Sequence, residues 1–235
     1  MKKFRIVFVL LTMLVFSLYG LVISEEVQPN KIVEPQPVPG VIYKRYAVKS
    51  GIVEYIISGT FKGIEVVYFE DWGMREARHK KSGSEMLGFS SRLTVIERDW
   101  VYTIDLDNRL GTKAQDLDVK QILDEPVEIS EVNIHERLLA LWEAVPVSEE
   151  KVIEKSCKVW RVEKKGQKFW LWNWLPLKSE TKTGVNETLL TAVSVNLDVP
   201  IHPEKFQIPD GIQYIQGDLD SILISAKPQP GKENL

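Results

Sequence analysis

The residue types that most often carry chemistry are few in this chain and lie far apart. Its histidines are His79, His135 and His202, and no two of them have the helical or hairpin spacing typical of a zinc site. The single cysteine, Cys157, begins an apolar strand pattern and is predicted to be a small buried hydrophobic residue rather than a nucleophile. We therefore expect neither a metal nor another cofactor.

The sequence contains no catalytic motif with a recognisable spacing. It has no Gly-x-Ser-x-Gly elbow, no phosphate-binding loop and no Gly-x-Gly-x-x-Gly fingerprint. Two acidic pairs, Glu70 with Asp71 and Asp105 with Asp107, could bind a cation or act in acid-base chemistry. Both pairs lie at predicted strand ends, where charge stays hydrated, so solvated edges are the favoured interpretation. The sequence predicts a protein that is not an enzyme.

Tryptophan forms the most distinctive pattern. The chain has seven, and Trp170, Trp172 and Trp174 alternate within one predicted strand, which directs the three indoles to one face. That face is either core packed against a helix or the wall of an apolar cavity, and the sequence leaves both interpretations open. Phe169 and Leu171 make the opposite face apolar too, so the strand is predicted to be central in its sheet.

Period-two patterns dominate the segments that must position these residues. The predicted strands cover residues 51–59, 63–71, 75–81, 91–98, 100–108, 157–164, 168–174, 176–183 and 189–199. Most connections are too short for the crossover that a parallel pair needs, so neighbouring strands should be antiparallel. The predicted fold class is mainly β with a helical insertion (α+β): a large curved antiparallel sheet or incomplete β-barrel covered by one or two helices.

Two helices are predicted between the strand groups. Residues 118–125 form a short candidate that Pro126 ends. Residues 133–145 form an amphipathic candidate, with Asn133 as its cap and Pro146 as its stop. Its apolar stripe consists of Ile134, Leu138, Leu141 and Val145, widened by Leu139 and Trp142. Because this stripe must be buried, the helix is predicted to cover the concave face of the sheet.

The N-terminus has the pattern of an export signal. Residues 1–5 include three basic side chains, and residues 6–23 contain no charged one. We favour a signal peptide cleaved after Ser24, and an uncleaved anchor formed by residues 6–23 is the alternative. In both cases the remainder is expected to be extracytoplasmic, either free in the periplasm or anchored to the inner membrane.

Proline content and charge complete the outline. Residues 25–40 hold four prolines and are predicted to be a linker, residues 41–226 a single domain, and residues 227–235 a flexible tail. The chain has 30 basic and 33 acidic residues, which argues against an extensive nucleic-acid-binding surface.

Three segments resemble a known family, the exported bacterial proteins with the lipoprotein-carrier type of fold, similar to LolA and LolB. The segments are KSGIVEYIISGTFKGIEVVYFEDWGMREAR at 49–78, WVYTIDLDNRLGTK at 100–113 and VWRVEKKGQKFWLWNWLPLKSETK at 159–182, and the resemblance extends over roughly residues 41–210. It implies a deeply curved, incomplete antiparallel barrel whose open side is plugged by helices, with an apolar cavity that takes acyl chains.

The predicted function is that of an envelope protein without enzymatic activity. It would bind a lipid, an acyl chain or another hydrophobic small molecule in a cavity between sheet and helix. The predicted lining is Trp100, Tyr102, Leu138, Trp142, Trp170 and Trp172. The alternative is a structural or protein-interaction module of the cell envelope with a filled core. No nucleic acid is expected as a partner, and membrane contact is expected only through an uncleaved N-terminal segment.

Overall fold

The structure is a computed structural model that describes residues 40–84, 88–126, 130–184 and 186–215. The chain divides into residues 1–36 and 37–235, and only the second unit contains described residues. The predicted signal or anchor, the predicted linker up to residue 39 and the predicted tail lie outside the described residues.

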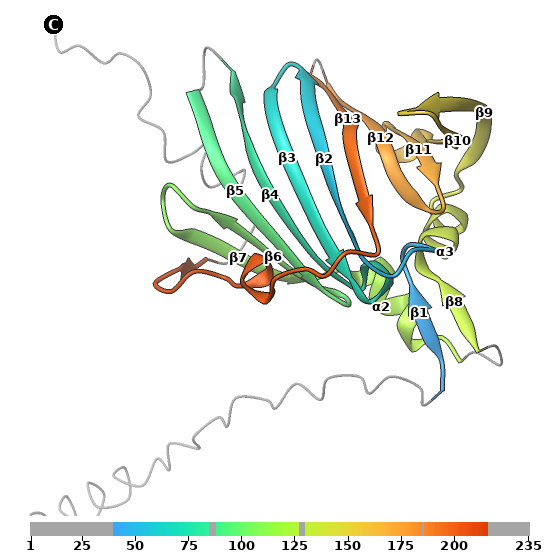
Figure 1. Cartoon of the computed structure of the whole chain (residues 1–235), viewed down its shortest axis with the longest axis horizontal. Helices are drawn as coiled ribbons and strands as arrows, with labels where there is room; N and C mark the ends of the chain where they lie inside the picture. The colour runs from blue at the N-terminus through green and yellow to red at the C-terminus, as the bar shows by residue number, and fades with distance from the viewer. Residues whose placement is uncertain (1–39, 85–87, 127–129, 185, 216–235) are drawn as a thin grey trace, which may run out of the picture. The chain divides into compact units, whose positions relative to one another are not determined.

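A curved sheet of twelve strands dominates the described part of the chain (Figure 1). Its order is β14-β7-β6-β5-β4-β3-β2-β13-β12-β11-β10-β9, so it has two edges and is not closed into a barrel. All neighbours pair antiparallel except β14 and β7. The strands are β2 (Gly51–Gly59), β3 (Lys62–Glu70), β4 (Arg75–Ser84), β5 (Gly88–Glu97), β6 (Trp100–Asp105), β7 (Leu110–Gln115), β9 (Val145–Val152), β10 (Lys155–Val162), β11 (Gln167–Trp172), β12 (Leu175–Thr183), β13 (Asn186–Leu197) and β14 (Gln213–Tyr214). The predicted fold class is confirmed.

Two helices and a small parallel pair of strands complete the fold. The helices are α2 (Leu117–Asp124) and α3 (Ile134–Leu141), and the pair is β1 (Ile42–Lys44) with β8 (Glu131–Asn133). Asn133 caps α3 as predicted, because its side chain accepts a hydrogen bond from the Glu136 amide. Among the described residues, no helix is both long enough and apolar enough to cross a membrane.

Helix α3 is shorter than its sequence pattern predicted. It ends in a Schellman motif, in which Glu143 has a φ of 55° and the Ala144 amide donates to the Leu139 carbonyl at 2.8 Å. The chain then turns into strand β9, where the sequence predicted the last helical residues up to Val145. The predicted stop at Pro146 therefore lies inside a strand at the edge of the sheet, a position that proline tolerates.

Strand β4 has buried side chains on both faces of the sheet. Ala77 faces a cluster beneath the C-terminal segment that includes Phe206, with Leu93, Val95 and Ile104 beside it. Arg78, the next residue, points to the opposite face, because successive side chains of a strand alternate. The C-terminal segment thus covers one face of the sheet, and Arg78 faces the other.

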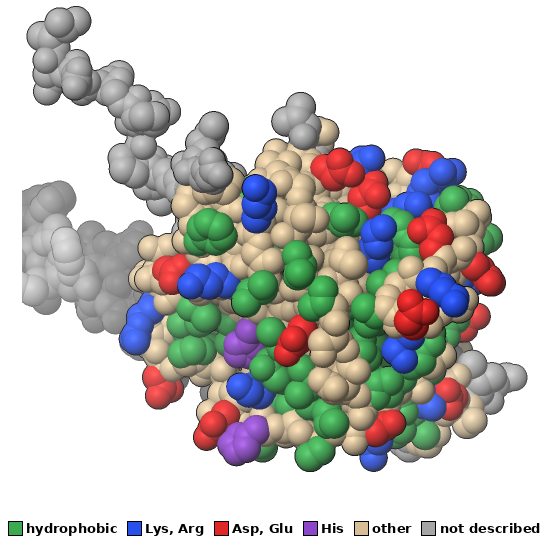
Figure 2. Space-filling model, turned by 45° about the horizontal axis from the view of Figure 1, so that its top comes forward, with side chains coloured by type: hydrophobic (Ala, Val, Ile, Leu, Met, Phe, Trp, Pro, Cys, Tyr) green, Lys and Arg blue, Asp and Glu red, His purple; other side chains and the backbone are tan. Residues whose placement is uncertain are grey.

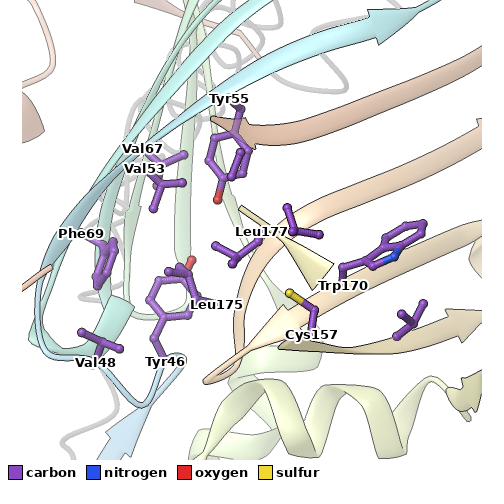
Figure 3. Close-up of a cluster of buried hydrophobic side chains, with 13 residues drawn as sticks. Tyr46, Val48, Val53, Tyr55, Val67, Phe69, Cys157, Trp170, Leu175 and Leu177 are labelled. Carbon is purple, nitrogen blue, oxygen red and sulfur yellow. The ribbon is translucent and has the colours of Figure 1, made fainter. Parts of the chain in front are cut away.

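A cluster of buried apolar side chains joins the two halves of the sheet (Figure 3). Its members are Tyr46, Val48, Val53, Tyr55, Val67, Phe69, Val152, Cys157, Val159, Trp170, Leu175, Leu177 and Ala192. The Tyr55 hydroxyl, from β2, donates to the carbonyl of Pro176 in β12 at 2.7 Å. Cys157 is fully buried, as predicted, and burial raises the pKa of its thiol.

Gly73 brings the segment before β2 close to the start of β4. It follows Asp71 and Trp72, which like Gly73 have positive φ values, and a Cβ at Gly73 would lie 2.5 Å from the Tyr46 ring. Only glycine permits this approach without displacement of the ring. The tight turn thereby fixes Tyr46 in the core, which matters for the site described below.

The outer surface is mixed in charge. The face shown in Figure 2 carries acidic and basic side chains next to one another, with hydrophobic side chains between them. The ion pairs at the surface of the described residues include Lys182 with Glu180 at 3.0 Å. Pairs of this kind contribute little to stability because solvent screens them.

Candidate functional site

A cavity of about 150 Å³ lies between α3 and the sheet. Its lining residues are Arg78 from β4, His135, Leu138, Leu139 and Trp142 from α3 and its C-terminal end, Phe169 and Leu171 from β11, and Pro176 and Ser179 from β12. Most of the wall is apolar. The polar exceptions are Arg78, His135 and Ser179.

The cavity lies inside the curve of the sheet. Strands β4 and β12 are separated by β3, β2 and β13, so in a flat sheet they would be about 19 Å apart. Arg78 and Ser179 nevertheless line the same small space. The sheet must therefore bend around it, and α3, which supplies the opposite wall, lies on the concave side. This arrangement agrees with the predicted position of the helix.

A buried ionic network borders the cavity. Arg78 donates through Nε to Glu76 and through Nη1 to Glu65 at 3.3 Å, and the Tyr46 hydroxyl donates to the other oxygen of Glu76. Glu65 and Glu76 are only 5% and 1% exposed. Burial by itself would raise the pKa of Glu76, but Arg78, Tyr46 and Arg45 outweigh it, and the pKa is lowered from its usual value. Glu76 is therefore ionised and paired.

His135 is held neutral beside this network. Its Nδ1 lies 2.8 Å from the Trp174 carbonyl, and its ring packs edge-on against Tyr46 with 5.3 Å between the ring centroids. Burial lowers the pKa of His135 to about 4, and the nearby charge of Arg45 acts in the same direction. At neutral pH the imidazole is thus uncharged.

Helix α3 is fixed in place at both ends of its apolar stripe. Leu138 packs into the cluster formed with α2, which includes Val119 and Ile122, and Leu139 packs against Val162 and Leu171 of the sheet. At the end of the helix, the Trp142 indole donates to Asp118 of α2 at 2.7 Å. The wall of the cavity that α3 forms is therefore held by packing against both α2 and the sheet.

The structure brings together two of the six predicted lining residues. Leu138 and Trp142 line the cavity, whereas Trp170 belongs to the core cluster that contains Cys157 and Trp172 packs against that cluster. Trp100 and Tyr102 are on β6, where the Lys113 ammonium lies 4.4 Å and 5.2 Å from their ring centroids. These last four residues do not line the cavity.

The expectation that all three alternating tryptophans share a face is wrong. A bulge between Trp170 and Leu171 and positive φ values at Asn173 and Trp174 break the alternation. Trp174 therefore packs with Leu139 and Trp142. Its neighbours Trp170 and Trp172 stay with the other cluster.

Sequence reasoning missed the polar lining and the sheet side of the apolar lining. Phe169 and Leu171 had a usable signal, because they alternate with the tryptophans and so make the opposite face of their strand apolar. Arg78 had a weaker one, since Glu76 two residues earlier shares its face. Neither pattern shows that β4 and β12 meet across a cavity.

The acidic pairs serve local structure. Glu70 accepts a hydrogen bond from Arg75 at 2.8 Å. Asp105 is buried, contrary to the solvated edge that was expected, because it accepts bonds from the backbone amides of Asp107 and Asn108 in the following turn. Within the described ranges, no group of three or more His, Cys, Asp or Glu side chains could hold a metal ion.

Comparisons with known proteins give structural similarity at a low level. No protein-family model and no curated protein matches the chain. One similar solved structure is an uncharacterized conserved protein from Thermus thermophilus, with a TM-score of 0.44 and 11% identity over 70% of this chain and 89% of that one. MucB matches with a TM-score of 0.38 and 14% sequence identity, over 70% of this chain and 59% of the MucB chain. LprF from Mycobacterium bovis matches with a TM-score of 0.30 and 9% sequence identity, over 65% of this chain and 89% of the LprF chain. Similarity at this level assigns neither a family nor a function.

Proposed function

We propose that this protein binds a small hydrophobic molecule, or one end of an acyl chain, in the cavity beneath α3. The observation that carries this proposal is a partly open space with mostly apolar walls between a helix and a curved sheet. A cavity of about 150 Å³ with apolar walls is known to hold a molecule of the size of benzene. Drug-sized ligands occupy about 300–1,000 Å³, so only a short or terminal part of a longer ligand would fit.

The proposed function is binding without chemistry. The groups that could react have structural roles: Glu76 and Arg78 neutralise each other, and Cys157 lies in the core with a raised thiol pKa. His135, held uncharged, donates to a backbone carbonyl through Nδ1. With the predicted export signal, the protein would act in the periplasm or at the outer side of the inner membrane.

A structural or interaction module of the cell envelope is the second candidate. One observation favours it: β9 is an edge strand whose residues are exposed apart from Val152. Val145 and Val147 are 43% and 44% exposed. An exposed edge strand can pair with a strand of another protein, although Pro146 removes one of its donors.

A pair of variants on β12 tests the first proposal. Ser179→Leu places a branched apolar side chain into the cavity, whereas Thr181→Leu, on the same face two residues further, lies outside the lining. Binding of an uncharged fluorescent probe with a medium-length alkyl chain to the full chain should be saturable, and Ser179→Leu should weaken it at least tenfold. Thr181→Leu should leave it within about twofold of wild type. Absence of saturable binding to the wild-type protein would refute the proposal and favour the second candidate.

A further inference from the structure

The three polar groups of the cavity differ in the hydrogen bonds they can still form. Arg78 uses Nε and Nη1 to bind Glu76 and Glu65. Its Nη2 has no hydrogen-bond partner among the described residues. This atom is solvent-accessible, because the Arg78 side chain is 33% exposed and Nη2 is not among the buried polar atoms without a partner. A guanidinium nitrogen only donates, so Arg78 offers an occupant a hydrogen-bond donor.

His135 offers the opposite group, a hydrogen-bond acceptor. A carbonyl oxygen can only accept, so the contact of 2.8 Å with Trp174 requires the proton of the neutral ring to be on Nδ1. Nε2 then carries a lone pair. It also has no partner among the described residues and is accessible, and the ring lines the cavity.

Ser179 adds a hydroxyl that can donate or accept. The polar part of the wall is thus one donor, one acceptor and one adaptable group. Its charge is balanced, since the two carboxylates Glu65 and Glu76 lie near two cations: Arg78 pairs with both, and Arg45 also acts on Glu76.

From this arrangement we infer that the cavity selects an uncharged ligand that carries a hydroxyl group on an apolar body. This inference rests on the proposed function and specifies the ligand class. A hydroxyl both donates and accepts, so it can donate to His135 Nε2 and accept from Arg78 Nη2. The apolar body would lie against Leu139, Phe169 and Leu171. Fatty alcohols, monoacylglycerols and small phenols share this chemistry.

Charged headgroups fit the same wall poorly. A carboxylate only accepts, so its lone pairs would oppose the lone pair of His135, and its charge would be a third negative one near Glu65 and Glu76. An ammonium group only donates, and its positive charge would face Arg78.

Four ligands with the same octyl chain separate these cases: 1-octanol, octyl methyl ether, octanoate and octylammonium. The ether can accept from Arg78 but cannot donate to His135, and its headgroup is larger by one methyl group. Its comparison with the alcohol therefore tests this hydrogen bond together with headgroup size, and the His135 variant below separates the two. In calorimetric titrations of the full chain at pH 7, 1-octanol should bind about fivefold more tightly than the ether. Octanoate and octylammonium should bind more weakly than 1-octanol.

A variant and a spectroscopic measurement identify the group responsible. His135→Phe removes the acceptor and should make the affinities for alcohol and ether equal. If this variant does not fold, the nitrogen-15 resonances of the native imidazole give the same information. Nε2 of His135 should resonate as an unprotonated nitrogen and move upfield on addition of 1-octanol but not of the ether.

The outcomes distinguish this inference from the proposed function. Equal affinity for 1-octanol and the ether, or a preference for octanoate, would overturn the selection of a hydroxyl but would leave hydrophobic binding intact. A protonated Nε2 in the native protein would overturn it as well. If none of the four ligands binds, the proposed function fails, and the inference fails with it.

Discussion

The uncharged state of His135 should make the stability of this protein depend on pH. The pKa of its imidazole is about 4 in the folded protein and has the ordinary value of 6.5 in the unfolded chain. One pKa unit corresponds to about 1.4 kcal/mol, so the shift is equivalent to about 3 kcal/mol of unfolding free energy. As the pH falls from 6.5, the unfolded chain gains a proton that the folded protein does not accept until about pH 4. The contribution of neutral His135 to the free energy of unfolding is therefore fully present above pH 6.5 and is lost as the pH falls towards 4.

Comparison of the wild type with His135→Gln isolates this contribution. Glutamine does not titrate, and its amide can still donate to the Trp174 carbonyl. In urea unfolding, the stability difference between the two proteins should change by about 3 kcal/mol between pH 7 and pH 4, with the wild type losing more. Glu76 has a lowered pKa and is present in both proteins, so its own loss of stability lies at lower pH and cancels in the difference.

A constant difference between the two proteins over this range would refute the argument. It would mean that His135 binds its proton equally well in the folded and unfolded states, and hence that burial and Arg45 do not act on it as described. A change of the opposite sign would mean that the buried carboxylate of Glu76 stabilises a protonated imidazole.

Four further results are expected. Arg78→Met leaves two buried carboxylates without their cation, so it should lower the free energy of unfolding by about 3–5 kcal/mol in urea, and unchanged stability would contradict the network. Gly73→Ala places a Cβ 2.5 Å from the Tyr46 ring at a φ of 81°, so a loss of at least about 1 kcal/mol is expected, and a wild-type melting curve would count against this packing. Cys157 should react with a thiol reagent slowly in folded protein and rapidly after unfolding, whereas equal rates would place it at the surface. A reporter enzyme active only outside the cytoplasm should be active when fused after residue 40, and an inactive fusion would remove the export prediction.

Local patterns predicted nine of the twelve strands of the described sheet and missed β7, β9 and β14. The strand predicted at residues 51–59 is β2, Gly51–Gly59, in which Val53, Tyr55 and Ile57 alternate on the buried face and glycines stand at both ends. The start of α3 could also be predicted from local sequence, because the Asn133 cap and the apolar stripe lie within a few residues of each other. Strands β1, β8 and β14 have only two or three residues, too few for a periodic signal.

The candidate site was predictable only on its helix side. Leu138 and Trp142 belong to one amphipathic stripe, which the sequence displays directly. The sheet side depends on how far twelve strands bend, and this curvature brings Arg78 and Ser179, about a hundred residues apart in sequence, to one cavity. The position of Trp174 depends on a backbone turn with positive φ, which no period-two pattern indicates.

The two unlike faces of β4 have a consequence for how the strands find their alignment during folding. Ala77 fits beneath Phe206, and Arg78 fits between two carboxylates on the opposite side. A slip of β4 by one residue would exchange every side chain between the faces and would place Arg78 among the buried apolar side chains of Leu93, Val95 and Ile104. The same slip would leave Glu65 buried without its cation. Misaligned sheets would thus be less stable than the native one, so this adjacent pair of residues favours the native pairing of β4 with β3 and β5.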